Sequence, residues 1–331
     1  MKIHYLSYGK YITGGFLHEK FYAESLLALL QSKQIDAELI EFRTPTFFEN
    51  VFEHFRMNWN AFWQASAPIN ILVSRYALAA LVRSLFSSHK FIVVMHYEDN
   101  KDGNSWLFQL YFNTFYFLLN LTKPRNLAIL TVAPFWKDYF KHKCPRISIL
   151  YFPNLINPEP IKSIVQAKVE KLIHLGQWSW KNDQQIFVLA KQLKQQGYTC
   201  YFSTNRSEEA GDFDNYSIIS EGYESYIKRM SSASYTIAFT SINEGWNRVA
   251  HESILCGTPV IGFFKGGLGD LLKESNSFIV KNVSEAVHII LNQQQPNINP
   301  NFTERYSIGN FSSFIKDSEV FLWNESVKSS Q

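Results

Sequence analysis

The chain has 331 residues, of which 46% are hydrophobic and 18% are charged. This composition excludes an intrinsically disordered protein, and the length predicts two domains. The formal net charge of +3 is far below that of nucleic-acid-binding proteins, although a mildly basic balance suits an anionic membrane surface.

The cysteines and the amino terminus predict a reduced, cytosolic protein. Cys144, Cys200 and Cys256 are far apart in the sequence and include no Cys-x-x-Cys pair, so we expect free thiols. The amino terminus has neither the long apolar run nor the small-residue cleavage site of a secretion signal. Residues 106–121 come nearest to a membrane span, but polar residues interrupt them.

Short apolar runs alternate with amphipathic segments over the first 152 residues. The runs predict strands at 3–7, 37–42, 69–74, 91–95, 127–132 and 147–152. Helical spacing appears between them, first at residues 16–30. Such alternation predicts an α/β fold with a parallel sheet that helices cover on both faces.

Two short segments of this half are candidates for ligand contact. Gly14 and Gly15 lie between the first strand and the first helix, where a missing side chain lets a ligand approach the backbone. His96 follows a predicted strand, at the end where ligands bind in open α/β sheets. A plain turn at the glycines and a structural role for His96 are the alternatives.

Residues 47–68 contain a stripe of large apolar side chains. They recur every three or four positions, at Phe48, Val51, Phe52, Phe55, Trp59, Phe62 and Trp63. The stripe either packs in the core or forms an interfacial surface that lies on a membrane or holds a lipid-linked acceptor. Residues 106–121 are open to the same two interpretations.

Residues 153–160 contain three prolines and predict a linker, after which the alternation starts again. The strands predicted for the second half lie at 171–175, 198–203, 217–220, 235–240, 260–264 and 278–280. Helices are expected at 184–196, 223–231, 250–256 and 285–291, and a closing helix is expected from residue 311.

The second half also carries the most informative motif of the chain. Glu244-Gly-Trp-Asn leads into a short predicted helix that holds Glu252 and ends at Gly257, before Pro259. Carboxylates accept hydrogen bonds from sugar and ribose hydroxyls, and the amides of a helix N-terminus favour phosphate oxygens. The segment therefore suits a sugar nucleotide, and an ordinary helix with two solvated glutamates is the alternative.

Together with Gly14-Gly15, His96 and Pro153-Asn154, the segment from Glu244 to Gly262 resembles the retaining glycosyltransferases of GT-B fold, family four. Members of that family commonly carry Glu-Gly-Phe-Gly followed by Glu-Ala-Met-Ala-x-Gly-x-Pro-Val, with seven residues between the two glutamates. The resemblance implies two Rossmann-like domains that face a cleft.

The implied domains are an acceptor-side domain at 1–155 and a sugar-nucleotide domain at 156–310. A closing helix at 311–331 is expected to return to the first domain. In the second domain the resemblance implies that Glu252 binds the ribose hydroxyls and that Glu244 contacts the donor sugar.

Further site residues follow from the same resemblance. The backbone amides of the helix N-terminus are implied to meet the diphosphate, at Asn247, Arg248 and Val249. The resemblance implies that His96 faces the transferred sugar, that Gly14-Gly15 lies beside the phosphates and that Lys181 neutralises the leaving diphosphate. Base selectivity is expected around Tyr223. No metal or other cofactor is expected, because cationic side chains and helix dipoles supply the positive charge.

One position departs from the family pattern. The family has Gly-Arg after the first strand of the second domain, whereas this chain has Gly176-Gln177, with Lys181 four residues after the glutamine. A cation expected at the diphosphate is therefore missing, which puts the efficiency of catalysis in question. Arg206 and Arg248 are candidate replacements, and a solvated surface position is the alternative for each.

Asp212-Phe-Asp214 matches the Asp-x-Asp of metal-dependent transferases of the other major fold. The triplet lies in a polar segment and is common by chance, so we expect no metal there.

The sequence thus predicts a metal-independent glycosyltransferase. Its donor is expected to be a nucleoside-diphosphate sugar, its acceptor a glycan or a lipid-linked molecule, and its stereochemistry retaining. The resemblance implies bacterial surface polysaccharide or glycolipid synthesis, in the cytoplasm or at the inner face of the cell membrane. Two alternatives stay open: a catalytically weakened partner that stabilises an active transferase, and a sugar-nucleotide epimerase.

Overall fold

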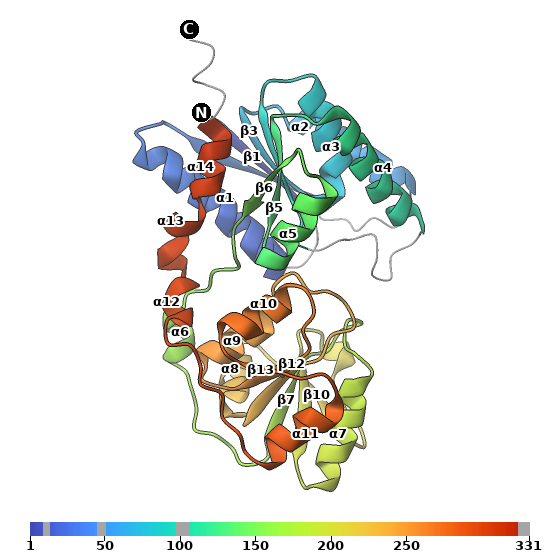
Figure 1. Ribbon diagram of the computed structural model, residues 1–331, viewed down its shortest axis with the longest axis vertical. Helices are drawn as coiled ribbons and strands as arrows, with labels where there is room; N and C mark the ends of the chain where they lie inside the picture. Colours follow the sequence, from blue (N-terminus) through green and yellow to red (C-terminus); the bar gives the residue numbers. More distant parts are fainter. Residues whose placement is uncertain (9–13, 45–50, 97–105, 324–331) are drawn as a thin grey trace. The chain divides into compact units, whose positions relative to one another are not determined.

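The computed structural model describes residues 1–8, 14–44, 51–96 and 106–323. The chain forms two compact units, each built around one sheet (Figure 1). Unit 1 comprises Met1–Asn154 and Asn310–Gln331, and unit 2 comprises Leu155–Gly309.

Unit 1 contains a six-stranded parallel sheet in the order β2-β1-β3-β4-β5-β6. The strands are β1 (Lys2–Tyr8), β2 (Glu38–Thr44), β3 (Ile69–Val73), β4 (Lys90–Val94), β5 (Leu127–Thr131) and β6 (Ser148–Tyr151). The helices between them are α1 (Gly14–Ser32), α2 (Val51–Gln64), α3 (Ala77–Leu85), α4 (Trp106–Thr122) and α5 (Pro134–Lys143). Every residue of β3 and β5 is buried, as expected for strands that helices cover on both faces.

Unit 2 contains a seven-stranded sheet in the order β13-β12-β11-β7-β8-β10-β9. The strands are β7 (Leu172–Gln177), β8 (Thr199–Thr204), β9 (Gly211–Asp212), β10 (Ser217–Ser220), β11 (Tyr235–Ala238), β12 (Val260–Gly262) and β13 (Phe278–Ile279). All neighbours pair in parallel except β9, an antiparallel edge strand in the segment that the sequence predicted as a polar loop. Apart from β9, this is the doubly wound strand order of a Rossmann fold.

The helices of unit 2 are α6 (Glu159–Lys162), α7 (Gln185–Gln195), α8 (Tyr223–Ser232), α9 (Arg248–Leu255), α10 (Gly267–Glu274), α11 (Val283–Leu291) and α12 (Phe302–Arg305). Apolar residues of α7 and α11 pack with the sheet in one buried cluster that includes Leu189, Phe202, Ile237 and Ile290. The two Rossmann-like α/β domains predicted from the sequence are therefore confirmed. Within the described residues, no helix is both long and apolar enough to cross a membrane.

The carboxy-terminal segment packs on unit 1, but it is not one continuous helix. It forms α13 (Phe311–Phe314) and α14 (Lys316–Trp323), which are separate helices. The hydroxyl of Ser313 donates to the carbonyl of Asn310 at 2.8 Å, a local bond of the kind that competes with helix continuation. α14 is held by a hydrogen bond from Tyr22 to Ser318 at 2.8 Å and by an ion pair between Lys137 and Asp317 at 2.7 Å.

The aromatic stripe of α2 lies mostly at the surface. Met57 and Ala61 are the residues of this helix that are buried in the core. Four aromatic side chains are more than half exposed, namely Phe52, Phe55, Trp59 and Trp63. Core packing is therefore the wrong explanation for these four, while Phe48 lies outside the described residues.

Each unit contains a fully enclosed histidine. In unit 1, His18 Nε2 donates to the carbonyl of Phe152 at 2.8 Å, and burial lowers the pKa of His18 to about 3, helped by the neighbouring His96. In unit 2, His174 lies within 3.3 Å of Thr236 Oγ1 and 3.2 Å of Ser203 Oγ, and burial lowers the pKa of His174 to about 3. Both rings are therefore neutral in the folded protein near pH 7.

We predict that these two histidines make the protein sensitive to acid. Each is neutral when folded but takes up a proton below pH 6.5 when unfolded, so its contribution is complete above pH 6.5 and is lost as the pH falls towards 3. The loss is roughly 1.4 kcal/mol per pH unit for each histidine. Urea unfolding of wild type and His18→Gln as a function of pH should show the stability gap narrowing below pH 6.5. A gap independent of pH would contradict the prediction.

Candidate functional site

The candidate site begins at the carboxyl ends of β7 and β11, which are neighbours in the sheet of unit 2. The chain leaves β7 towards β8 and leaves β11 towards β12, on opposite sides of this pair. The connections therefore diverge at this pair of strands, and ligands bind at such switch points in open α/β sheets. Lys181 follows β7 and Glu244 follows β11, and their Nζ and Oε2 atoms are 3.5 Å apart.

Backbone contacts between loops set this pairing. The amide of Ser241 donates to the carbonyl of Lys181 at 2.8 Å, and Asn182 forms an antiparallel bridge with Thr240. On the other side, the amide of Gly267 donates to the carbonyl of Glu244 at 2.8 Å. Three loops, after β7, β11 and β12, are thus tied together around Glu244.

Gly266 allows the third of these loops to approach so closely. Its φ of 56° lies in the left-handed region, and a Cβ at this position would lie 2.6 Å from the carbonyl oxygen of Glu244. Any larger residue would therefore have to push Glu244 away.

The turn after Glu244 leads into α9 as predicted, although the helix begins at Arg248 rather than at Ala250. Asn247 is the N-cap, and its side-chain oxygen accepts from the amide of Ala250 at 2.9 Å. Trp246 is buried and donates from Nε1 to Nδ1 of His251 at 3.2 Å. The amides of the first turn, at Arg248 and Val249, have no carbonyl four residues earlier within the helix, which is the property that favours anions at this end.

Glu252 lies on α9 and is 3% exposed. Its Oε1 accepts from Tyr223 at 3.0 Å and from Arg248 Nε at 2.8 Å, and its Oε2 accepts from Tyr226 at 3.1 Å. A buried carboxylate is costly unless it is paired and hydrogen-bonded, and these three donors meet that requirement. The alternative of a solvated Glu252 is therefore wrong.

The three donors are themselves affected by Glu252. Burial and the carboxylate raise the pKa values of the Tyr223 and Tyr226 hydroxyls above their usual range, so both are protonated donors. Burial acts to lower the pKa of Arg248, but the carboxylate outweighs it and the net shift is upward. A carboxylate has about four acceptor positions, so Oε2 can accept one more hydroxyl, and Oε1 can do so when Tyr223 or Arg248 moves.

Tyr226 is a residue of this site that sequence reasoning missed. It lies three positions after Tyr223 on α8, a spacing that puts two side chains on one helix face. That spacing could have identified Tyr226 as a companion of Tyr223. The sequence alone does not say which face of α8 meets α9, so it could not show that both residues contact Glu252.

The two candidate replacement cations are in different environments. Arg248 is half-buried and paired with Glu252, so a solvated surface position is the wrong interpretation for it. Arg206 is exposed and pairs with Glu209 at 3.0 Å, close to its own strand end. Gln177 is exposed at the end of β7, and its backbone carbonyl accepts from Asn182.

The described residues contain no group of three or more His, Cys, Asp or Glu side chains that could hold a metal ion. Asp212 and Asp214 are exposed, and Asp212 belongs to the edge strand β9. Nothing in their surroundings distinguishes the triplet as a metal site.

In unit 1, His96 follows β4 and pairs with a second residue that the sequence did not single out. His96 Nε2 lies 2.9 Å from Oε1 of Glu19, and Oε2 of Glu19 accepts from the Tyr5 hydroxyl at 3.0 Å. Since a carboxylate accepts, Nε2 of His96 carries a proton and the ring orientation is fixed. Gly14 and Gly15 form the start of α1, the helix that carries Glu19, while residues 9–13 lie outside the described residues.

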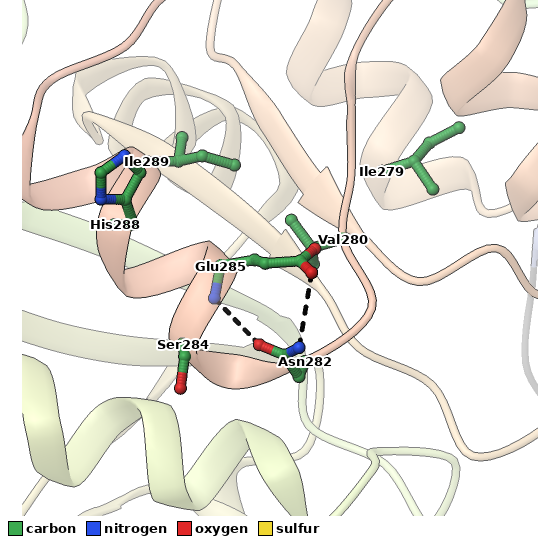
Figure 2. Close-up of a pocket in the computed structure, with 7 residues that line it drawn as sticks. All are labelled: Ile279, Val280, Asn282, Ser284, Glu285, His288 and Ile289. Atoms are coloured by element: carbon green, nitrogen blue, oxygen red, sulfur yellow. Dashed lines mark hydrogen bonds between the residues drawn. The ribbon is translucent and has the colours of Figure 1, made fainter.

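A shallow hollow of about 450 Å³ lies elsewhere on unit 2, between β13 and α11 (Figure 2). Its polar groups are used within the protein: Glu285 accepts from the amide of Lys281 at 2.9 Å, and Asn282 caps α11 by accepting from the amide of Glu285. Figure 2 shows Glu285 reaching back to Asn282, whose side-chain amide donates to Oε1 of Glu285 at 3.4 Å. The predicted site residues do not line this hollow.

Comparison with known proteins gives no match to a family model and none to curated proteins. Solved structures, by contrast, match over the whole chain. A glycosyltransferase from Rickettsia africae ESF-5 aligns with a TM-score of 0.63 at 14% identity, covering 99% of this chain and 100% of the other. The chain has the GT-B glycosyltransferase fold.

Two further structures agree. Alr3699/HepE from Anabaena, in complex with UDP, aligns with a TM-score of 0.65 at 14% identity and covers 96% of this chain and 99% of its own. Sucrose-phosphate synthase from Thermosynechococcus elongatus aligns with a TM-score of 0.64 at 12% identity, over 99% and 98% of the two chains. At these identities the likeness establishes the fold, and the activity must be argued from the site.

We predict that Gly266→Ala destabilises unit 2 by about 1–3 kcal/mol, because it combines a left-handed backbone with a collision at Glu244. The matched control is Gly257→Ala, at a φ of 69° with no atom within 4 Å of the new Cβ. The control should cost only the backbone strain, about 1 kcal/mol. Urea unfolding of the two variants measures the difference, and equal losses would show that the contact with Glu244 is unimportant.

Proposed function

We propose that the protein is a glycosyltransferase that moves a sugar from a nucleoside diphosphate to an acceptor hydroxyl. The observation that carries the proposal is the ion pair of Lys181 and Glu244 at the switch point of the unit 2 sheet. Glu244 lies on the loop that leads to the capped N-terminus of α9, and the buried Glu252 lies in that helix. This combination offers one cation, one sugar-binding carboxylate, an anion-binding helix end and a carboxylate for a diol.

The proposed roles follow the chemistry of each group. The amides of Arg248 and Val249 bind the diphosphate, and Lys181 neutralises the charge that develops on it as the sugar leaves. Glu244 accepts hydrogen bonds from the sugar hydroxyls and keeps Lys181 in place. Glu252 accepts from the ribose hydroxyls, and the backbone near Tyr223 contacts the base.

Arg248 is proposed as the second cation, in place of the arginine that Gln177 does not provide. Its guanidinium is already ionised and lies at the N-terminus of α9. When a ribose diol takes its place on Glu252, Arg248 is free to turn to the diphosphate. Exchange of one anionic partner for another keeps the half-buried charge paired at each stage.

The finer features of the proposal come from the family resemblance. These are retention of configuration, independence of metal ions, and a glycan or lipid-linked acceptor in bacterial surface polysaccharide or glycolipid synthesis. His96, oriented by Glu19, is proposed to contact the transferred sugar, and Gly14-Gly15 to lie beside the phosphates. The reaction is proposed to take place in the cytoplasm, at the inner face of the cell membrane.

A second candidate function is that of a catalytically weakened partner of an active transferase. Gln177 favours it, because the leaving group then has one cation fewer than the family provides. Sugar-nucleotide epimerisation is a third candidate, which differs by needing no acceptor.

We predict that the purified protein, given nucleoside-diphosphate sugars and acceptors, releases nucleoside diphosphate, and that Glu244→Ala abolishes this release. The matched control is Glu224→Ala, which removes an exposed carboxylate on α8 that pairs with Lys228. Thermal shift measures donor binding in the same samples. Donor binding without any release, in every donor and acceptor pair, would exclude the transferase and favour the weakened partner.

We predict that Arg248→Gln weakens donor binding about 10- to 100-fold, the effect of one lost charge-assisted contact. Arg206→Gln is the control, because Arg206 is exposed and held by Glu209. Titration calorimetry with a nucleoside-diphosphate sugar gives both affinities. Tighter binding by Arg248→Gln would instead mean that Arg248 only covers Glu252.

A further inference from the structure

Helices α2, α3 and α4 lie side by side on one face of the unit 1 sheet (Figure 1). They belong to successive connections that cross the sheet in one direction, from β2 to β3, β4 and β5. Since such connections are right-handed, the three helices cover the same face. α2 and α4 are also joined directly, by a hydrogen bond from the Tyr111 hydroxyl to Asn58 Oδ1 at 3.1 Å.

The outer side of this helical layer is apolar. On α2, Phe52 is 75% exposed and Trp63 57%, and on α4, Trp106 is 69% exposed and Phe117 67%. We call the whole set the α2–α4 face; its members are Phe52, Phe55, Trp59, Trp63, Leu85, Phe86, Trp106, Leu110, Phe117 and Leu121. The exposed residues of α2 and of α4 recur at helical spacing, so each helix presents one continuous stripe.

The core of unit 1 does not require these side chains. α2 packs through Met57 and Ala61, and α4 through Phe112, Phe115 and Leu119, all of which are buried. Trp59 and Trp63 contact each other instead, with ring centroids 5.8 Å apart. An exposed apolar surface of this extent indicates a binding partner.

The charged residues near the α2–α4 face indicate the chemical class of the partner. α4 has no charged residue in its 17 positions. Between residues 51 and 125 the sequence contains four acidic residues, of which Glu53 lies in the part that the structure describes. The same stretch contains seven Arg and Lys residues, so basic residues outnumber acidic ones. In the described part they are Arg56, Arg75, Arg83, Lys123 and Arg125, together with Lys90, which lies over the ring of Phe321 in α14.

Two of these arginines lie over aromatic rings of α4 and α2. The guanidinium of Arg75 is 3.9 Å from the ring centre of Phe108, and that of Arg83 is 5.1 Å from the ring centre of Phe62. Aromatic and aliphatic side chains bordered by arginine and lysine are typical of surfaces that lie in the headgroup region of a bilayer.

We propose that the α2–α4 face binds the surface of a bilayer that contains anionic lipids. The aromatic side chains enter the boundary between headgroups and acyl chains, and the basic side chains pair with the phosphates. A second copy of the chain is a weaker candidate, because the same basic residues would meet each other across a symmetric interface. The inference extends the proposed location at a membrane, but its test requires neither donor nor acceptor.

We predict that the full chain sediments with vesicles of phosphatidylcholine and phosphatidylglycerol, and less with phosphatidylcholine alone. Trp59→Ser combined with Trp63→Ser should lower the partition coefficient about tenfold or more. Lys123→Ser and Arg125→Ser should each lower it about fivefold in the anionic vesicles only, with the effect fading at high salt. These positions are exposed, so the variants should fold.

The matched control is Phe213→Ser in unit 2, compared with Phe55→Ser in α2; the two side chains are 51% and 67% exposed. Only Phe55→Ser should reduce vesicle binding. Equal binding by all variants, or no preference for anionic vesicles, would overturn the proposal. Size-exclusion chromatography with light scattering, without lipid, measures whether the protein forms an oligomer. An oligomer that Trp59→Ser combined with Trp63→Ser dissociates, in a protein that binds no vesicles, would also overturn the proposal. The face would then be an interface with a second copy of the chain.

Discussion

The direction in which the chain leaves each strand of a parallel sheet is the constraint from which the candidate site follows. In unit 2 the connections leave β7 and β11 on opposite sides, which makes this pair of strands a switch point of the kind where ligands bind. Lys181 and Glu244 stand on those loops and meet at 3.5 Å. The backbone bond from Gly267 to Glu244 then adds a third loop, and α9 places its N-terminus beside them.

The second constraint is electrostatic. Burial of the Glu252 carboxylate requires donors, and Tyr223, Tyr226 and Arg248 provide them in the absence of a ligand. The proposed function draws its two cations from these ion pairs, because Gln177 stands where the family that the sequence resembles has arginine. One is Lys181, which pairs with Glu244, and the other is Arg248, which pairs with Glu252.

In unit 1 several large aromatic side chains lie at the surface and do not pack in the core. Helix α2 packs through Met57 and Ala61 and leaves four tryptophan and phenylalanine side chains outside. Helix α4 buries Phe112 and Phe115 but also presents exposed aromatic side chains. Exposed aromatic surface lowers solubility and gives nothing to the stability of the fold, so its place in the molecule is best explained by binding. The basic residues of these helices and of the adjoining loops are the reason for proposing a partner with anionic headgroups.

The sequence by itself determined the α/β class, the division into two similar halves and most strands, because buried parallel strands are continuous apolar runs. It also located Glu244, Glu252 and the helix between them, because N-cap, glycine and proline signals act locally. Tertiary structure decided the rest. Whether the stripe of α2 is core or surface, that Tyr223 and Tyr226 donate to Glu252, and that Glu19 orients His96 all depend on which helix faces meet. Those contacts join residues far apart in the chain, and no local pattern encodes them.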